Sequence, residues 1–205
     1  MKVSVNTEQI KNLRERTGAG YLDCKKALAD AGGDPEEAAK ILRAKGASIA
    51  AEKAGRLARQ GLIGSYVHGG RIGVLVEVNC ETDHVVRTDE FKKFVQELCL
   101  QIASQNPKYV TREDVPHEEI ADALSHLHDE IEGVEEEGAQ SMQQSHMEQF
   151  YRERVLLDQP YIRDNTKTIA DLLHDAVLSL RENIVIRRFI RFSLGESVEP
   201  TKPSA

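Results

Sequence analysis

Residues 79–87 form the run of this chain whose side chains are best suited to chemistry or recognition. Cys80 and His84 lie four residues apart, a spacing at which an imidazole could act as the base for a thiol nucleophile. Cysteine is among the most buried residue types, however, and Cys80 ends a segment with the pattern of a core strand, which favours inert packing. A thiol hydrolase that uses this pair is therefore kept only as the enzymatic alternative.

The same run could instead bind another molecule, because residues 83–86 offer an acidic group, a ring and two branched aliphatic side chains. Binding residues concentrate on short connections between rigid elements. Asp83 also has a plain structural explanation, since aspartate is common where a strand ends in a turn. On the residues alone, both interpretations stay open.

Other chemical motifs are missing from the sequence. It contains no P-loop, no H-E-x-x-H and no G-x-S-x-G pattern, and its seven histidines are scattered. His126 and His128 are two residues apart on a predicted helix, so they face different directions and cannot share a metal ion. The sequence therefore predicts no metal site, no cofactor and no enzyme.

The elements that must position this run are a hairpin before it and a helix after it. Alternating apolar residues in 72–78 predict a strand with one buried face, and residues 62–67 pair with it through the glycine-containing turn at 68–71. Thr88 begins a helix whose apolar residues recur at spacings of three and four. A last strand is predicted over residues 184–194.

Residues 1–55 are predicted to form a separate bundle of three short helices, with Thr7 as the first cap. The helices are expected to end at glycine-containing breaks, namely residues 18–20, residues 32–33 and Gly46. Residues 47–59 are rich in Ala, Lys and Arg, which predicts an exposed helix or a linker to the next domain.

Residues 56–198 are predicted to form a core of antiparallel sheet and helices, so the fold class is α+β. An acidic segment within it is expected to form a helical hairpin at about 117–158, with a narrow apolar seam and charged flanks. The second face of the sheet, expected to carry Leu75 and Tyr66, needs a cover. Residues 199–205, which contain two prolines, are predicted to be a disordered tail.

The charge of this 205-residue chain is unevenly distributed. Its formal net charge is −7, and residues 112–160 alone carry 3 basic and 14 acidic side chains. An acidic total argues against a protein that mainly neutralises nucleic-acid phosphates. No apolar run reaches the roughly 20 residues of a membrane span, and the N-terminus lacks a secretory signal pattern. With three widely spaced cysteines, we expect a cytoplasmic protein without nucleic-acid or membrane partners.

Three motifs follow one another along most of the chain. They are Thr17-Gly18-Ala19-Gly20 with Asp23-Cys24-Lys25-Lys26-Ala27-Leu28, then Val76-Glu77-Val78-Asn79-Cys80-Glu81-Thr82-Asp83, and finally Arg188-Phe189-Ile190-Arg191-Phe192 with Gly195-Glu196. In type and order they resemble the signatures of the translation elongation factor Ts family. The resemblance implies a guanine-nucleotide exchange factor for elongation factor Tu, which would meet its partner in GDP-bound and nucleotide-free forms.

The resemblance also assigns a role to the N-terminal bundle. In the family this module is a ubiquitin-associated-like (UBA-like) bundle that docks on the partner's G domain. The matching apolar contacts here are Leu13, Tyr21 and Leu22, although packing in the bundle core explains Leu13 and Leu22 equally well. Many members carry two methionines where this chain has Tyr21 and Leu22, so we expect a docking contact of altered shape.

The family's T-D-F-V motif maps onto Thr82, Asp83, His84 and Val85. The resemblance implies that this segment intrudes beside the partner's nucleotide site and disturbs Mg²⁺ coordination there, so this chain itself needs no bound metal. His84 departs from the phenylalanine of the motif, and an imidazole buries less apolar area and changes its charge near neutral pH.

Length is a second departure from the longer family members. Those members carry two related halves in the core domain, whereas this chain has one, and the resemblance to short members implies a homodimer. The alternative function without exchange activity is a UBA-like adaptor that binds another protein through its bundle.

Overall fold

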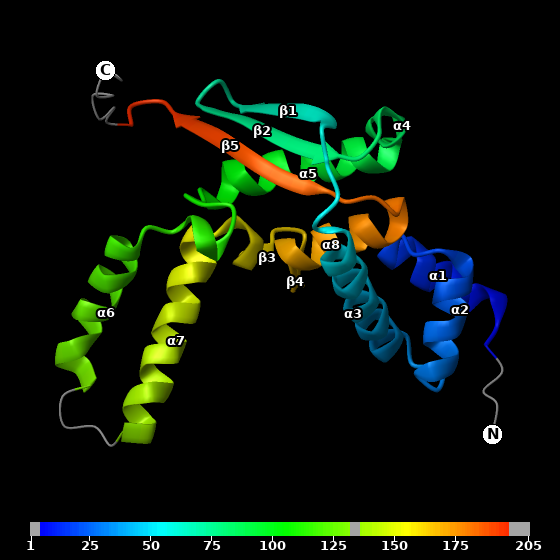
Figure 1. The fold of residues 1–205 in the computed structure, drawn as a ribbon, viewed down its shortest axis with the longest axis horizontal. Coiled ribbons are helices and arrows are strands. Elements are labelled where there is room, and N and C mark those ends of the chain that lie inside the picture. Colours follow the sequence, from blue (N-terminus) through cyan, green and yellow to red (C-terminus); the bar gives the residue numbers. More distant parts are fainter. Residues whose placement is uncertain (1–4, 132–135, 197–205) are drawn as a thin grey trace.

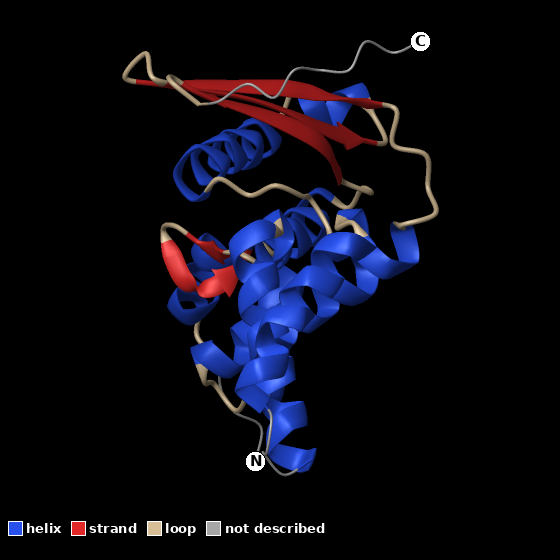
Figure 2. Ribbon diagram, turned by 90° about the vertical axis from the view of Figure 1, so that its left-hand side faces the viewer, coloured by secondary structure: helices blue, strands red, loops and turns tan. Residues whose placement is uncertain are grey.

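The computed structural model describes residues 5–131 and 136–196. Within these ranges the chain forms eight α-helices, a three-stranded antiparallel sheet and a two-stranded one, so the predicted α+β class is confirmed. The larger sheet forms one layer, and most of the helices gather on one side of it (Figure 2). None of the helices in the described ranges is long and apolar enough to cross a bilayer. The predicted tail, residues 199–205, lies outside the described residues.

The N-terminal bundle contains the three predicted helices, α1 (Thr7–Thr17), α2 (Tyr21–Asp30) and α3 (Pro35–Lys53). Asn6 caps α1 in place of the predicted Thr7. Its side chain accepts the Gln9 N–H at 2.7 Å, and the Gln9 side chain accepts the Asn6 N–H at 3.0 Å. Gly18 ends the helix at φ 67°, in the left-handed region that glycine adopts at little steric cost.

Helix α3 continues past Gly46, where we expected it to end. A Cβ atom at this position would lie 2.7 Å from the backbone oxygen of His174 in α8 (Ile169–Leu180). Gly46 is therefore a point of close approach between two helices, which is why a residue without a side chain occurs there. Residues 47–53 are helical, and only residues 54–59 form the connection to the next element.

The three-stranded sheet contains β1 (Gln60–His68), β2 (Ile72–Cys80) and β5 (Val185–Ser193), with β2 in the centre. The predicted hairpin is confirmed, and both Gly69 and Gly70 in its turn have positive φ. Helix α5 (Asp89–Gln105) packs on one face of the sheet, as its apolar spacing predicts. The residues of β2 buried on this face are Val74, Val76, Val78 and Cys80.

The opposite face of the sheet exposes several large apolar side chains beside an ion pair between Glu77 and Arg188. Its large side chains, each between 47% and 67% exposed, are Ile63, Val67, Leu75, Ile190 and Phe192. Tyr66 was expected on this face, and that prediction was wrong. The strand register places Tyr66 opposite Val74, so it points to the core side and is partly buried there. We call the five listed residues the outer sheet face.

The acidic segment forms the predicted helical hairpin, which extends from the rest of the chain as a separate arm (Figure 1). Its elements are α6 (His117–Ile131) and α7 (Glu136–Arg154), flanked by the short 3-10 helices η1 (Arg112–Asp114) and η2 (Leu156–Asp158). The Arg112 guanidinium fastens the base, because it donates to both Asp158 and Glu148 at 2.9 Å. Three short elements were not predicted: α4 (Asp83–Val86), β3 (Pro160–Tyr161) and β4 (Asp164–Thr168).

Helix α8 packs with both parts of the chain. Its Val177 belongs to the core beneath the sheet, whereas the next residue, Leu178, is fully buried among the bundle helices. Thr168 caps this helix and accepts the Asp171 N–H at 3.1 Å. The predicted domain boundary near residue 55 remains a prediction. In space, α8 contributes buried residues both to the core of the bundle and to the core beneath the sheet.

Candidate partner-binding site

The segment that resembles T-D-F-V lies between the end of β2 and the start of α5. We expected an open loop, but its residues form the one-turn helix α4, with Thr82 at the N-cap position. Thr82, Asp83 and His84 are exposed, whereas Val85 is only 5% exposed and belongs to the core. The segment therefore presents three side chains to the surroundings and is anchored by the fourth.

Contacts with α5 hold one side of the segment. The carbonyl of Val85 accepts the Thr88 hydroxyl at 2.7 Å, and the Thr88 oxygen accepts the Phe91 N–H at 3.2 Å. Asp83 and Arg87 also pair at 2.6 Å, but both side chains are exposed, so their pairing adds little. The firm anchor on this side is the buried Val85 together with the Thr88 cap.

A second anchor comes from Glu182, which lies 100 residues after Thr82 in the sequence. Its carboxylate accepts the backbone N–H groups of Glu81 and Thr82, each at 3.0 Å, and also the Thr82 hydroxyl. Hydrogen bonds to an ionised acceptor are stronger than those between neutral groups. Sequence reasoning missed Glu182, because no motif surrounds it and its contacts join distant parts of the chain.

Cys80 is fully buried at the end of β2, and its thiol donates to the Thr82 carbonyl at 3.2 Å. Burial raises the pKa of this thiol to about 11. Such a thiol is protonated near neutral pH and is a poor nucleophile, while the proposed base, His84, lies exposed. The geometry favours a packing role for Cys80 over the thiol-hydrolase alternative.

Two of the three predicted docking residues lie on the surface of the bundle. Tyr21 and Leu22, in the first turn of α2, are 47% and 76% exposed. Leu13 is 1% exposed and packs in the bundle core. The structure thus supports the interpretation that Leu13 packs in the bundle core. In this conformation its side chain is not accessible to a partner.

Helices α2 and α4 both lie towards the right-hand side of the molecule in Figure 1. The turn that leads into α2 approaches the start of α5, since a Cβ atom on Gly18 would lie 3.2 Å from the Glu90 carboxylate oxygen. Because α4 immediately precedes α5, the turn before α2 lies near the end of α4.

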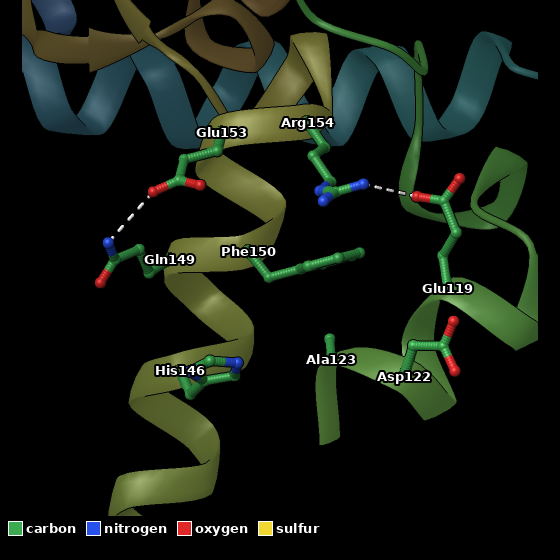
Figure 3. A pocket seen from close by; sticks show the side chains of 8 residues that line it. All are labelled: Glu119, Asp122, Ala123, His146, Gln149, Phe150, Glu153 and Arg154. Carbon is green, nitrogen blue, oxygen red and sulfur yellow. Dashed lines mark hydrogen bonds and ion pairs between the residues drawn. The ribbon is translucent and has the colours of Figure 1, made fainter. Parts of the chain in front are cut away.

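The hairpin contains a hollow between α6 and α7 (Figure 3). Glu119 and Arg154 pair there at 2.7 Å, and the Arg154 guanidinium lies 4.8 Å from the centre of the Phe150 ring. The Tyr109 hydroxyl also donates to Glu119 at 2.6 Å, and this bond is the main reason that the pKa of Glu119 is lowered. Nowhere in the described ranges do three metal-ligating side chains come together. We interpret the hollow as part of the joint at the base of the hairpin.

Comparison with known proteins agrees with the three motifs. The family model described as Elongation factor TS matches residues 24–196, a range that begins within α2 and includes α4 and the whole three-stranded sheet. Elongation factor Ts of Thermoanaerobacter sp. (strain X514) is 54% identical over 198 residues, which cover 95% of this chain and 97% of that protein. The protein of the same name from Caldanaerobacter subterraneus subsp. tengcongensis is 52% identical over 198 residues, 95% of this chain and 99% of the relative. That from Coprothermobacter proteolyticus is 49% identical over 197 residues, 95% and 100% of the two chains. With the motifs in order, and with similarity along nearly its full length, this chain belongs to the elongation factor Ts family of translation elongation factors.

Proposed function

We propose that this chain is a guanine-nucleotide exchange factor for elongation factor Tu, which accelerates GDP release and catalyses no covalent reaction. The observation that carries the proposal is the exposure of Thr82, Asp83 and His84 on a turn that is anchored from two sides. Membership of the elongation factor Ts family supports it. We call residues 82–86 the exchange turn.

Docking begins at the bundle, where Tyr21 and Leu22 place an aromatic ring and an aliphatic side chain on the surface. Exposed apolar groups of this kind gain free energy when a partner covers them, at about 25 cal/mol for each Å² removed from water. These two residues bind the G domain of the partner. The contact supplies affinity and brings the exchange turn to the nucleotide site.

The exchange turn then acts as a wedge beside the partner's Mg²⁺ and GDP. Magnesium requires closely set oxygen ligands in nearly ideal geometry, so a shift of its supporting loop by about 1 Å removes much of the nucleotide's affinity. The effect is reciprocal. If this chain weakens the partner's affinity for GDP, then GDP weakens the partner's affinity for this chain by the same ratio. This chain needs no nucleotide or metal of its own for that role.

We further propose that two copies of the chain associate through the outer sheet face. Five large apolar side chains are exposed on that face, in a sheet whose other face is already covered by α5. A self-complementary apolar surface suits a twofold dimer. The proposed role in translation also places the chain in the cytoplasm, with a protein partner rather than a nucleic acid or a membrane.

The direct test is the rate of GDP release. Elongation factor Tu loaded with mant-GDP, a fluorescent GDP analogue, is mixed with excess unlabelled GDP, with and without this chain. We expect a release rate that rises with the concentration of the chain and then saturates. The double variant Asp83→Ala/His84→Ala should lower the saturating rate, and Leu22→Asp should raise the concentration that gives half the maximal rate.

Glu148→Ala, which removes a surface carboxylate from the distant hairpin, is the matched control and should behave like the unaltered chain. Binding of elongation factor Tu without any faster release would contradict exchange and favour the adaptor alternative. If the two proteins do not bind each other at all, the proposed partner is wrong.

A further inference from the structure

Three consecutive residues after α8 each contact a different part of the molecule. Arg181 pairs with Asp23 of α2, Glu182 holds the start of the exchange turn, and Asn183 bonds to the linker between the bundle and the sheet. Arg181 has φ 60°, in the left-handed region that residues with a side chain seldom adopt. Such a conformation persists where the surrounding contacts enforce it.

We propose that Arg181, Glu182 and Asn183 form a positioning clamp that fixes the exchange turn relative to the docking residues of α2. The clamp rests on the proposed function, because it sets the distance between two surfaces that must engage one partner together. None of its three residues is proposed to touch the nucleotide.

The part of the clamp that holds the exchange turn consists of two reciprocal carboxylate contacts. Glu182 accepts the N–H groups of Glu81 and Thr82 at 3.0 Å, while Glu81 accepts the Asn183 N–H at 2.6 Å. Each carboxylate thus binds the backbone of the other's segment. Because the hydrogen bonds run in both directions across the junction, the exchange turn cannot shift unless both segments move.

The part of the clamp that holds the bundle is the contact between Arg181 and Asp23. Asp23 lies on α2, two positions after Tyr21 and one after Leu22, and its carboxylate pairs with Lys45 of α3 as well as with Arg181. The Asp23 side chain is only 16% exposed, whereas that of Arg181 is 49% exposed, so the carboxylate is largely covered while the guanidinium faces solvent. Leu178, one turn before Arg181, is fully buried among the bundle helices and fixes α8 against them.

Asn183 connects the clamp to the linker. Its residue is 5% exposed, and its side-chain amide donates to the carbonyl of Arg56 at 2.8 Å. A buried amide left without its acceptor would cost free energy, so this contact restrains the connection between the bundle and β1. The linker is the segment about which the bundle would otherwise turn.

A wedge that works by a displacement of about 1 Å must itself be positioned more tightly than that, and misplacement on this scale lowers rates by about a hundredfold in enzymes. The clamp supplies that precision through buried and charged contacts from one short segment. We therefore expect its loss to reduce the maximal exchange rate, measured when the partner is saturated, more than the affinity for the partner.

The test compares Glu182→Ala with Glu182→Gln in the mant-GDP assay. The alanine variant should lower the saturating release rate about tenfold. The glutamine variant should stay within about threefold, because its amide oxygen still accepts two N–H groups and its NH₂ can donate to the Thr82 hydroxyl. A merely destabilised protein would contain fewer active molecules, which raises the half-saturating concentration and leaves the saturating rate unchanged.

Arg181→Ala tests whether the contact with the bundle and the contact with the exchange turn act as one unit. We expect a loss of saturating rate similar to that of Glu182→Ala, and a double variant no slower than the slower single one, because residues that act together give non-additive effects. Glu148→Ala is again the control. If Glu182→Ala does not fold, Glu182→Asp shortens the same contact by one methylene and should give a smaller loss of the same kind.

Hydrogen exchange of the free protein separates this proposal from the proposed function. Amides within residues 81–86 should exchange faster in Glu182→Ala than in the unaltered chain and Glu182→Gln. Unchanged protection, additive losses in the double variant, or a glutamine variant as slow as the alanine one would overturn the clamp. If the unaltered chain fails to accelerate GDP release, the proposed function fails and the positioning role fails with it. Faster amide exchange in Glu182→Ala would then show only that the contacts hold the turn.

Discussion

At the scale of single residues, His84 is the position where this chain departs from the motif of its family. Its ring is exposed on α4, next to an ion pair between Asp83 and Arg87. A phenylalanine would bring only apolar area, whereas the smaller imidazole ring of histidine carries two polar nitrogen atoms. In the proposed mechanism, a wedge that enters an apolar crevice is therefore weaker with histidine than with phenylalanine.

We predict that His84→Phe raises the saturating rate of GDP release, because a phenyl ring buries more apolar area in the crevice than an imidazole does. The measurement is the saturating mant-GDP release rate of both proteins, with the partner's own release rate subtracted. Equal rates for the two proteins would contradict the prediction.

Asp23 is a second residue whose protonation state matters. A hydrogen bond from Lys45 is the main cause of its lowered pKa, and the charge of Arg181 lowers it further. A lowered pKa means that folding favours the charged carboxylate, so the stabilisation is present above the unfolded-state pKa of about 4 and is lost as the pH falls below it.

We therefore expect Asp23→Asn to be less stable than the unaltered chain at about pH 7, and the difference to shrink towards about pH 3. Urea unfolding at both pH values measures it. Asp30→Asn, which alters an exposed carboxylate at the end of the same helix, is the control and should differ little from the unaltered chain at either pH. A difference for Asp23→Asn that is the same at both pH values would show that proton linkage at this residue is not the cause.

At the scale of elements, the packing of α3 on α8 determines how the bundle sits on the core. The two helices approach most closely at Gly46, where a Cβ atom would come within 2.7 Å of a backbone oxygen of α8. A backbone atom cannot rotate away as a side chain can, so any added side chain must separate the helices. Glycine there is required by the neighbouring helix and not by the conformation of α3.

We predict that Gly46→Ala lowers the free energy of unfolding by about 1–3 kcal/mol, despite the better helix propensity of alanine. Gly55→Ala is the matched control, because a Cβ atom there would meet no other atom within 4 Å. Urea unfolding of both variants measures the difference. A Gly46→Ala protein as stable as the control would mean that α3 and α8 can move apart freely.

The elements also show which parts of the fold could be predicted from the sequence. Alternating and helical spacings are local, so they predicted the hairpin of β1 and β2, helix α5, and the arm formed by α6 and α7. The one-turn helix α4 and the short strands β3 and β4 have too few residues to carry a period. Tyr66 was placed on the wrong face because the register set by the turn decides the face, and Glu182 was missed because its partners lie about a hundred residues away.

At the scale of the whole molecule, the outer sheet face groups large apolar side chains that the fold leaves exposed. Ile63 and Val67 of β1, Leu75 of β2, and Ile190 and Phe192 of β5 form one apolar surface opposite the core. Contiguous exposed apolar surface of this kind marks an interaction site. In the proposed dimer, a second copy of the chain offers an identical surface, so that each copy covers the other.

If the proposed dimer forms through this face, we predict that Leu75→Glu converts it to a monomer at micromolar concentration without unfolding the chain, because this side chain already faces away from the core. A buried charge at the centre of such an interface should raise the dissociation constant more than about tenfold. Sedimentation velocity measures the change, and Ile162→Glu, an exposed position outside this face, is the control. An unaltered chain that sediments strictly as a monomer while driving full exchange would contradict the dimer.

The helix shared by the bundle and the core has a consequence for synthesis on the ribosome. The chain is made from its N-terminus, so α1 to α3 leave the ribosome well before α8, which ends at Leu180. Until then the place of Leu178 among the bundle helices is empty, and the Asp23 carboxylate lacks Arg181. The N-terminal bundle is thus the first part of the protein to be synthesised and one of the last to be completed.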